Sequence, residues 1–163
     1  MSGFLTGYGT LECNLKNLGI ESMDANNDIG LLKERLNRDI NDIDAALSLG
    51  NLYYDMNDAP RSIVYYRRVL DINPALSNAR TDLGAMYWRN EDIGLAEQAF
   101  RDAISGDSSF GQAYVNLGLL LQHARGKIAE ARAVWQQLLA VNPEHALAAK
   151  ARELLQETAA SIN

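Results

Sequence analysis

The chain has 163 residues, of which 47% are hydrophobic and 22% are charged, and its formal net charge is −6. This length allows one hydrophobic core, no apolar stretch reaches the ~20 residues of a membrane-spanning helix, and the negative charge argues against a nucleic-acid partner. Cys13 is the only cysteine, which excludes an internal disulfide and a multi-cysteine metal site.

Residues 1–27 form the least regular part of the sequence. They are rich in glycine and asparagine, and apolar side chains such as Phe4, Tyr8 and Leu11 are scattered among them. This composition predicts an N-terminal arm or linker that becomes ordered only when it docks on a surface. Two alternatives stay open at this point: a plain tether, or a segment that docks on this chain or on a neighbouring copy.

The stretch DANNDIG at Asp24–Gly30 has oxygen-bearing side chains at alternate positions, as calcium loops do. An EF-hand loop needs glycine at its sixth position and a bidentate glutamate at its twelfth, where this chain has Ile29 and Arg35. We therefore predict a polar linker without a metal, followed by a helix over residues 28–38 with Asn27 or Asp28 as its N-cap.

A Leu-Gly pair recurs with a period of 34 residues, at Leu49-Gly50, Leu83-Gly84 and Leu117-Gly118. Three further positions recur at fixed offsets: a large apolar residue, a small residue and a large aromatic residue. In the order of the copies, these are Tyr53, Tyr87 and Leu121; Ser62, Ala96 and Ala131; and Tyr66, Phe100 and Trp135. The third copy is one residue longer in its turn. A fixed period of this length predicts stacked helical units.

Each copy predicts two short amphipathic helices, because apolar residues return every three or four positions in both of its halves. Asn57 and Asp58 separate the two helices of the first copy: asparagine tolerates left-handed dihedrals, and aspartate can cap the next helix. Pro60 fits the first turn of that second helix. The glycine of each Leu-Gly pair leaves room where the two helices cross.

The period also predicts the domain limits. Ile29, Leu32 and Leu36 repeat the spacing of a second helix, so residues 28–42 are expected to be a partial repeat. The full repeats would cover residues 43–76, 77–110 and 111–145. Residues 146–163 would form a capping helix, because Arg152-Glu153 stands where a fourth Leu-Gly pair would be.

The sequence contains no motif of a known catalytic site. His123 and His145 are the only histidines, and they do not have the spacing of a zinc-binding pair. Nucleophile-elbow, P-loop and dinucleotide-binding patterns are also lacking. We expect both histidines on the solvated surface, and we predict no catalytic residue, no metal, no cofactor and no enzymatic activity.

The recurring Leu-Gly, Tyr, small residue, aromatic and Pro pattern resembles the tetratricopeptide repeat (TPR) from about Asp28 to the end of the chain. The resemblance implies an all-α TPR solenoid of antiparallel helix pairs, and a non-enzymatic scaffold or adaptor that binds a peptide or protein segment in a concave groove. It also implies the groove positions, on the first helix of each pair. They are Asp44, Leu47, Asn51, Tyr54, Asp55, Asn78, Thr81, Ala85, Trp88, Arg89, Gln112, Val115, Asn116, Leu119, Gln122 and His123.

Tyr54 and Trp88 are the expected anchors of a partner, because other aromatic residues already fill the core positions. Some family members grip the terminal carboxylates of chaperone tails with lysines, an arginine and asparagines. Of that set only Asn51 is present in this chain. The other clamp positions hold Leu47, Asp82, Gln112 and Asn116 instead. This disfavours a co-chaperone of that type.

The helix around Trp135, followed by Pro143, is loosely similar to bacterial repeat proteins that assist cytochrome c maturation. This likeness favours a bacterial protein in a membrane-associated assembly. Separately, we expect a cytoplasmic protein, or a soluble domain whose membrane anchor is not in this sequence. An alternative function stays open: a self-assembling structural protein, a homo-oligomer in which the N-terminal arm of one copy occupies the groove of the next.

Overall fold

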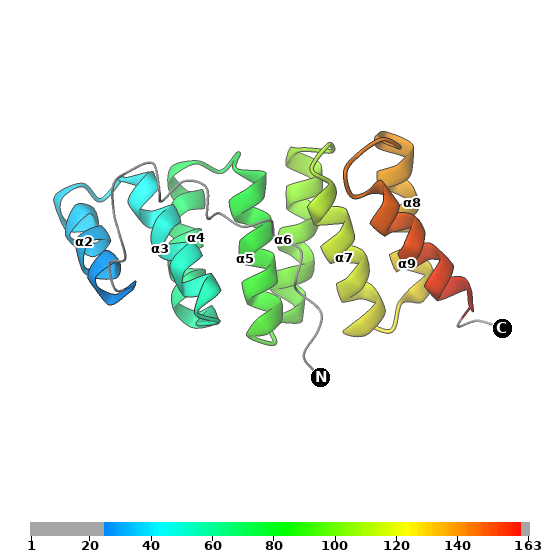
Figure 1. The fold of residues 1–163 in the computed structure, drawn as a ribbon, viewed down its shortest axis with the longest axis horizontal. Coiled ribbons are helices and arrows are strands. Elements are labelled where there is room, and N and C mark those ends of the chain that lie inside the picture. The colour runs from blue at the N-terminus through cyan, green and yellow to red at the C-terminus, as the bar shows by residue number, and fades with distance from the viewer. Residues whose placement is uncertain (1–24, 161–163) are drawn as a thin grey trace.

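The protein is a row of short helices joined by tight turns (Figure 1). The computed structural model describes residues 25–160, and within that range it contains no strand. The helices are α2 (Ala25–Arg38), α3 (Ile43–Asp55), α4 (Ala59–Ile72), α5 (Ser77–Arg89), α6 (Ile93–Gly106), α7 (Gly111–His123), α8 (Ile128–Val141) and α9 (Ala148–Ala160). The predicted all-α stack is confirmed. Among these helices, none has the length and apolar character needed to cross a membrane.

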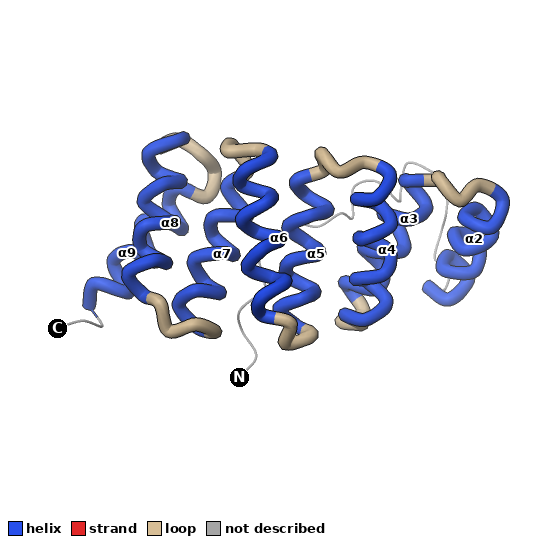
Figure 2. Tube along the Cα trace, turned by 180° about the vertical axis from the view of Figure 1, so that it is seen from behind, coloured by secondary structure: helices blue, strands red, loops and turns tan. Residues whose placement is uncertain are grey.

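The helices form two layers. α3, α5 and α7 lie in the layer that faces the viewer in Figure 1, and α4, α6 and α8 lie in the layer that faces the viewer in Figure 2. Each helix contacts the next one along the chain. In addition, α5 contacts α7, and α7 contacts α9. We call the outer surface of the first layer the α3–α5–α7 face.

The turn inside each helix pair uses a left-handed residue at the same position of every copy. Asn57, Glu91 and Gly126 have φ angles of 58°, 65° and 67°. Asp58 then caps α4, because its side chain accepts a hydrogen bond of 3.1 Å from the backbone N–H of Arg61. The sequence interpretation of Asn57 and Asp58 is thus confirmed.

The two helices of each pair cross where the Leu-Gly glycine faces a buried aromatic ring. The matched residues are Gly50 with Tyr66, Gly84 with Phe100, and Gly118 with Trp135. A Cβ atom would lie 3.0 Å from the ring of Tyr66 at Gly50 and 2.7 Å from the ring of Phe100 at Gly84, and at Gly118 it would overlap the indole of Trp135. Real Cβ atoms essentially never come as close as they would at Gly84 and Gly118, and at Gly50 the tyrosine ring would have to move by a few tenths of an ångström. The three aromatic side chains are at most 1% exposed.

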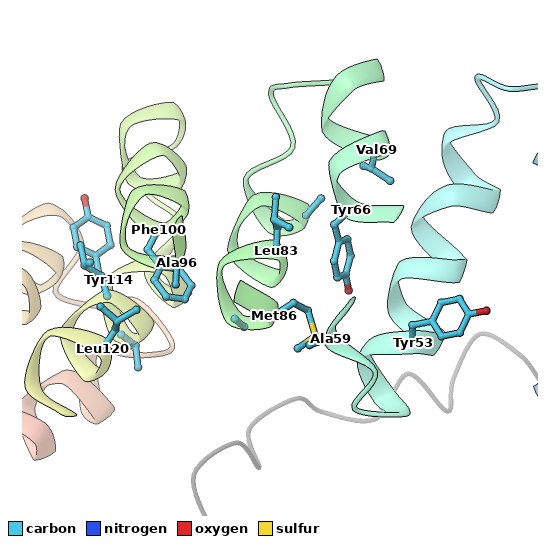
Figure 3. Packing of buried hydrophobic residues seen from close by; sticks show 14 of the residues in the cluster. Tyr53, Ala59, Tyr66, Val69, Leu83, Met86, Ala96, Phe100, Tyr114 and Leu120 are labelled. Atoms are coloured by element: carbon cyan, nitrogen blue, oxygen red, sulfur yellow. The ribbon is translucent and has the colours of Figure 1, made fainter. Parts of the chain in front are cut away.

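The core runs along the whole row instead of forming one central cluster. In Figure 3 the side chains of Tyr53, Tyr66, Met86 and Phe100 come from successive helices and lie at successive levels of the stack. Burying a large apolar side chain contributes about 1.5–3 kcal/mol. Each helix pair is therefore stabilised mainly by its immediate neighbours.

The beginning of α2 corrects one sequence prediction. Asn27 and Asp28 lie inside this helix, which starts at Ala25, so neither is the N-cap. The predicted polar linker is also helical from Ala25 onward, which is incompatible with a calcium loop there. The period itself contained the correct signal, because Asp24-Ala25 stands 34 residues before Asp58-Ala59, where α4 begins. The predicted arm lies mostly outside the described residues.

His145 corrects a second prediction. Its ring packs against Gly111, where a Cβ atom would lie 2.6 Å from the ring Nδ1. The same Nδ1 accepts a hydrogen bond of 3.0 Å from the backbone N–H of Leu147. His145 therefore connects the start of α7 to the loop before α9, and it is not a solvated surface residue. His123 is exposed, as expected.

Candidate partner-binding face

All the predicted groove positions lie on the first layer of helices. α3 holds Asp44, Leu47, Asn51, Tyr54 and Asp55; α5 holds Asn78, Thr81, Ala85, Trp88 and Arg89; α7 holds Gln112, Val115, Asn116, Leu119, Gln122 and His123. The period returns each equivalent position to the same layer in the next copy. The fold thus brings residues from three repeats to one face.

These positions differ in how much surface they offer. Asp44, Asp55, Asn78 and His123 are exposed, and most of the others are partly buried. Four are buried, with exposed fractions of 1% for Thr81, 5% for Ala85, 4% for Val115 and 5% for Asn116. All four lie on α5 and α7, which contact each other. These four side chains are therefore part of the packed interior beneath the face, and they offer little surface to a partner.

Tyr54 and Trp88, the expected anchors, are half-buried. The guanidinium of Arg89 lies 4.5 Å from the centroid of the Tyr54 ring, and Arg89 Nη1 donates a hydrogen bond of 3.2 Å to the Tyr54 carbonyl oxygen. Burial also raises the pKa of the Tyr54 phenol. Trp88 packs partly against the core. Both rings are therefore held in place before any partner arrives.

Three polar residues of the face, Asn51, Gln112 and Asn116, are already hydrogen-bonded. The hydroxyl of Tyr66 donates a bond of 2.7 Å to Asn51 Oδ1, and Gln112 Nε2 donates a bond of 2.8 Å to Asn116 Oδ1. Gln122 differs, because its Oε1 is buried and has no hydrogen-bond partner among the described residues. A buried acceptor without a donor is costly, and in a native structure it requires an explanation.

Asp82, on α5, is the residue of this face whose pKa is shifted furthest from its ordinary value. Burial, and then the charge of Asp55, raise the pKa of the Asp82 carboxyl to about 7. In the described part of the chain, no hydrogen bond and no cation offsets this effect. In the sequence, Asp82 stands out only as a mismatch to the carboxylate clamp. The overlooked signal was an acidic residue at a clamp position, which the fold places on α5.

Chemistry of other kinds is not indicated in the described residues. They contain no group of three or more histidine, cysteine, aspartate or glutamate side chains that could hold a metal ion. An open pocket lies off the face, where α8 begins, and is lined by Lys127, Glu130 and Arg132 among others. Arg132 is engaged there with the backbone of α9, where its Nη1 lies 2.6 Å from the Leu155 carbonyl oxygen. The α3–α5–α7 face is therefore the candidate site.

Solved structures support the fold. MamA is 21% identical, with a TM-score of 0.71 over 93% of this chain and 90% of that chain. The TPR2B domain of yeast Sti1, in a complex with pHsp70, is 17% identical, with a TM-score of 0.66 over 73% and 97%. The first TPR of Spaghetti (RPAP3), bound to the HSP90 peptide SRMEEVD, is 23% identical, with a TM-score of 0.62 over 72% and 94%. At these identities the likeness concerns the fold alone.

Sequence comparison places the repeats in a family. Tetratricopeptide repeat models match residues 47–112 and residues 112–145. Tetratricopeptide repeat protein 8 of Caenorhabditis elegans is 29% identical over 66% of this chain, and the chain spans only 28% of the length of that relative. Together with the glycine–aromatic crossings and the left-handed turns, these matches show that the chain belongs to the tetratricopeptide repeat family.

Proposed function

We propose that this chain is a non-enzymatic scaffold that binds a peptide or protein segment across the α3–α5–α7 face. One observation carries the proposal. The core crossing repeats in every copy, whereas the row Tyr54, Trp88 and Gln122 changes its chemistry from one copy to the next. Packing of the solenoid explains the constant positions but does not require the variable row, and such variation suits the recognition of an irregular partner.

The relatives support the same class of function. TPR repeats are generally interaction modules, and the solved complexes of Sti1 and Spaghetti contain pHsp70 and an HSP90 peptide. The partner of this chain is expected to differ from an acidic chaperone tail, because Leu47 and Asp82 replace the lysine and asparagine of the clamp. A bacterial membrane-associated assembly, such as one for cytochrome c maturation, stays a prediction.

The test is to locate a bound peptide by crosslinking. Peptides are first selected from a random phage-displayed library against the full chain. A photoreactive benzoylphenylalanine is then placed at Asn78, which is exposed on α5, or at the matched control Val64, which is 61% exposed on α4 in the opposite layer. We expect the selected peptides to crosslink from position 78 and not from position 64.

Two results would overturn the proposal. The first is a selection that enriches no peptide. The second is crosslinking from position 64 without crosslinking from position 78, which would place the binding surface on the α4–α6–α8 layer. Binding of the arm of another copy would appear as a chain-to-chain crosslink from position 78 in the absence of peptide.

A further inference from the structure

Two acidic side chains on the α3–α5–α7 face lie where they oppose folding. Asp55 is the last residue of α3, and a negative charge at a helix C-terminus is unfavourable because the helix dipole is also negative there. Asp82 is half-buried and has no compensating partner among the described residues, which penalises its ionised form. The charge of Asp55 adds to that penalty. Folding alone gives no reason for this pair.

The cations near these acids do not neutralise them. The face has only two arginines and no lysine, because α3 and α7 contain neither residue type. Arg89 stacks on Tyr54 and is in ion-pair distance of neither acid, as far as the described residues go. Arg80 points to the other layer, with its Nη2 2.6 Å from the Pro74 carbonyl oxygen and its Nη1 3.9 Å from Asp102.

One acidic residue of the opposite layer has two cationic partners. Glu97, on α6, is paired with Arg101 at 2.8 Å and with Arg125 at 3.1 Å, and these arginines lower its pKa. Within the described residues, no ion pair involves Asp55 or Asp82. The face therefore presents acceptors that lack donors, and the buried Oε1 of Gln122 on α7 adds a third one.

We propose that the partner segment carries a lysine or arginine side chain that docks beside Tyr54, between Asp55 and Asp82. This inference rests on the proposed function and specifies the chemistry of the partner. The positive side chain supplies N–H donors to both carboxylates and removes their mutual repulsion. A peptide with an acidic residue at that point is rejected, because it would place a third negative charge beside the pair.

The experiment is a double-mutant cycle on the full chain. The probes are the peptides that the random library selection enriches, each compared with a copy in which its lysine or arginine is replaced by norleucine. They are measured by calorimetry on the unmodified chain, on Asp82→Asn, and on Asp71→Asn. Asp71 is the matched control, an exposed aspartate on α4 in the opposite layer.

We expect the selected peptides to be enriched in lysine and arginine. Norleucine replacement should weaken binding to the unmodified chain and to Asp71→Asn roughly 10-fold, and it should change binding to Asp82→Asn by less than about 2-fold. The control matters because any chain with a net charge of −6 attracts cations weakly at long range.

Two outcomes separate this inference from the proposed function. If peptides crosslink from position 78 but the norleucine effect is equal in Asp82→Asn and Asp71→Asn, the scaffold stands and the cation site is wrong. Selection of peptides without basic residues would also refute the cation site and leave the scaffold standing. If the selection enriches no peptide, the proposed function itself fails.

Discussion

The crossing of the two helices in each pair, which we call the seam, is constant from repeat to repeat, whereas the α3–α5–α7 face varies. In the seam, a glycine opposes a buried aromatic ring in all three repeats. On the face, equivalent positions hold residues as different as Tyr54, Trp88 and Gln122. The seam is paired and satisfied, whereas the face leaves Asp82 and the Gln122 Oε1 without partners among the described residues.

This contrast separates what the fold needs from what it does not need. A solenoid is held together by contacts between neighbouring units, so the contact between crossing helices cannot vary much without loss of packing. The outer surface of a layer has no such requirement. Residues that lower stability there, such as Asp82, are therefore candidates for function.

The largest expected effect concerns the seam. Gly118→Ala should lower the free energy of unfolding by about 1–3 kcal/mol, because the new methyl group overlaps the buried indole of Trp135. Gly30→Ala in α2 is the control, since no atom lies within 4 Å of its added Cβ, and it should stabilise by up to about 1 kcal/mol through helix propensity. Urea unfolding measures both. Equal effects would mean that the glycines are not selected by the crossing.

The next effect concerns the face and has the opposite sign. Asp82→Asn should stabilise the chain by about 1–3 kcal/mol near pH 8, where the carboxylate of the unmodified chain is ionised. The range allows for water that still reaches this half-buried group. The folded pKa of about 7 lies above the ordinary value of 3.8, so the unmodified chain loses stability as pH rises from about 4 to about 7.

Below about pH 4 the carboxyl is protonated in both the folded and the unfolded chain, so the advantage of Asp82→Asn should disappear there. The difference between the two unfolding curves isolates Asp82 from the paired acids, such as Glu97, whose pKa values are lowered. Thermal unfolding across this range is the measurement. A difference that does not depend on pH would refute the buried, unpaired state of Asp82.

A smaller effect is expected at the C-terminal end of the stack. Arg132 Nη1 lies 2.6 Å from the Leu155 carbonyl oxygen and 2.8 Å from Thr158 Oγ1, which attaches the last turns of α9 to α8. Arg132→Leu should cost about 1 kcal/mol and speed amide hydrogen exchange in α9. Arg101→Leu, which removes an exposed ion pair with Glu97, should cost less. Unchanged exchange in α9 would argue against this attachment.

The smallest effect concerns the turns. Glu91 has a φ of 65° at the position where the third repeat has Gly126. Glu91→Gly should stabilise by roughly 0.5–1 kcal/mol, because glycine adopts this conformation without steric cost. Asn57→Gly should change stability less, since asparagine tolerates left-handed dihedrals. The denaturation midpoints of the two variants are compared with that of the unmodified chain. A lower stability of Glu91→Gly would show that the glutamate makes a compensating contact.

The sequence predicts the seam well because its physics is periodic. Gly50, Gly84 and Gly118 could be assigned to the helix crossings from their spacing, and Asn57 and Asp58 to a turn from their chemistry. The beginning of α2 at Ala25 was missed because capping residues at Asn27 and Asp28 outweighed the period. The contact of His145 with Gly111 joins positions 34 residues apart and follows no repeated motif.

The face is predicted less well because exposure depends on the neighbouring side chains. Position in the repeat places Thr81 and Val115 on the first layer, but it does not reveal that both side chains are buried. Nor does it show that Arg89 stacks on Tyr54 and thus leaves Asp82 unpaired within the described residues. These facts depend on the directions of individual side chains.

The most direct test of the central claim is a backbone NMR titration of the full chain with a selected peptide. We expect the amide shifts that change most to lie on α3, α5 and α7, around Asp55 and Asp82, and to saturate with a one-to-one complex. Changes concentrated on α4, α6 and α8 would contradict the assignment of the α3–α5–α7 face as the partner-binding surface.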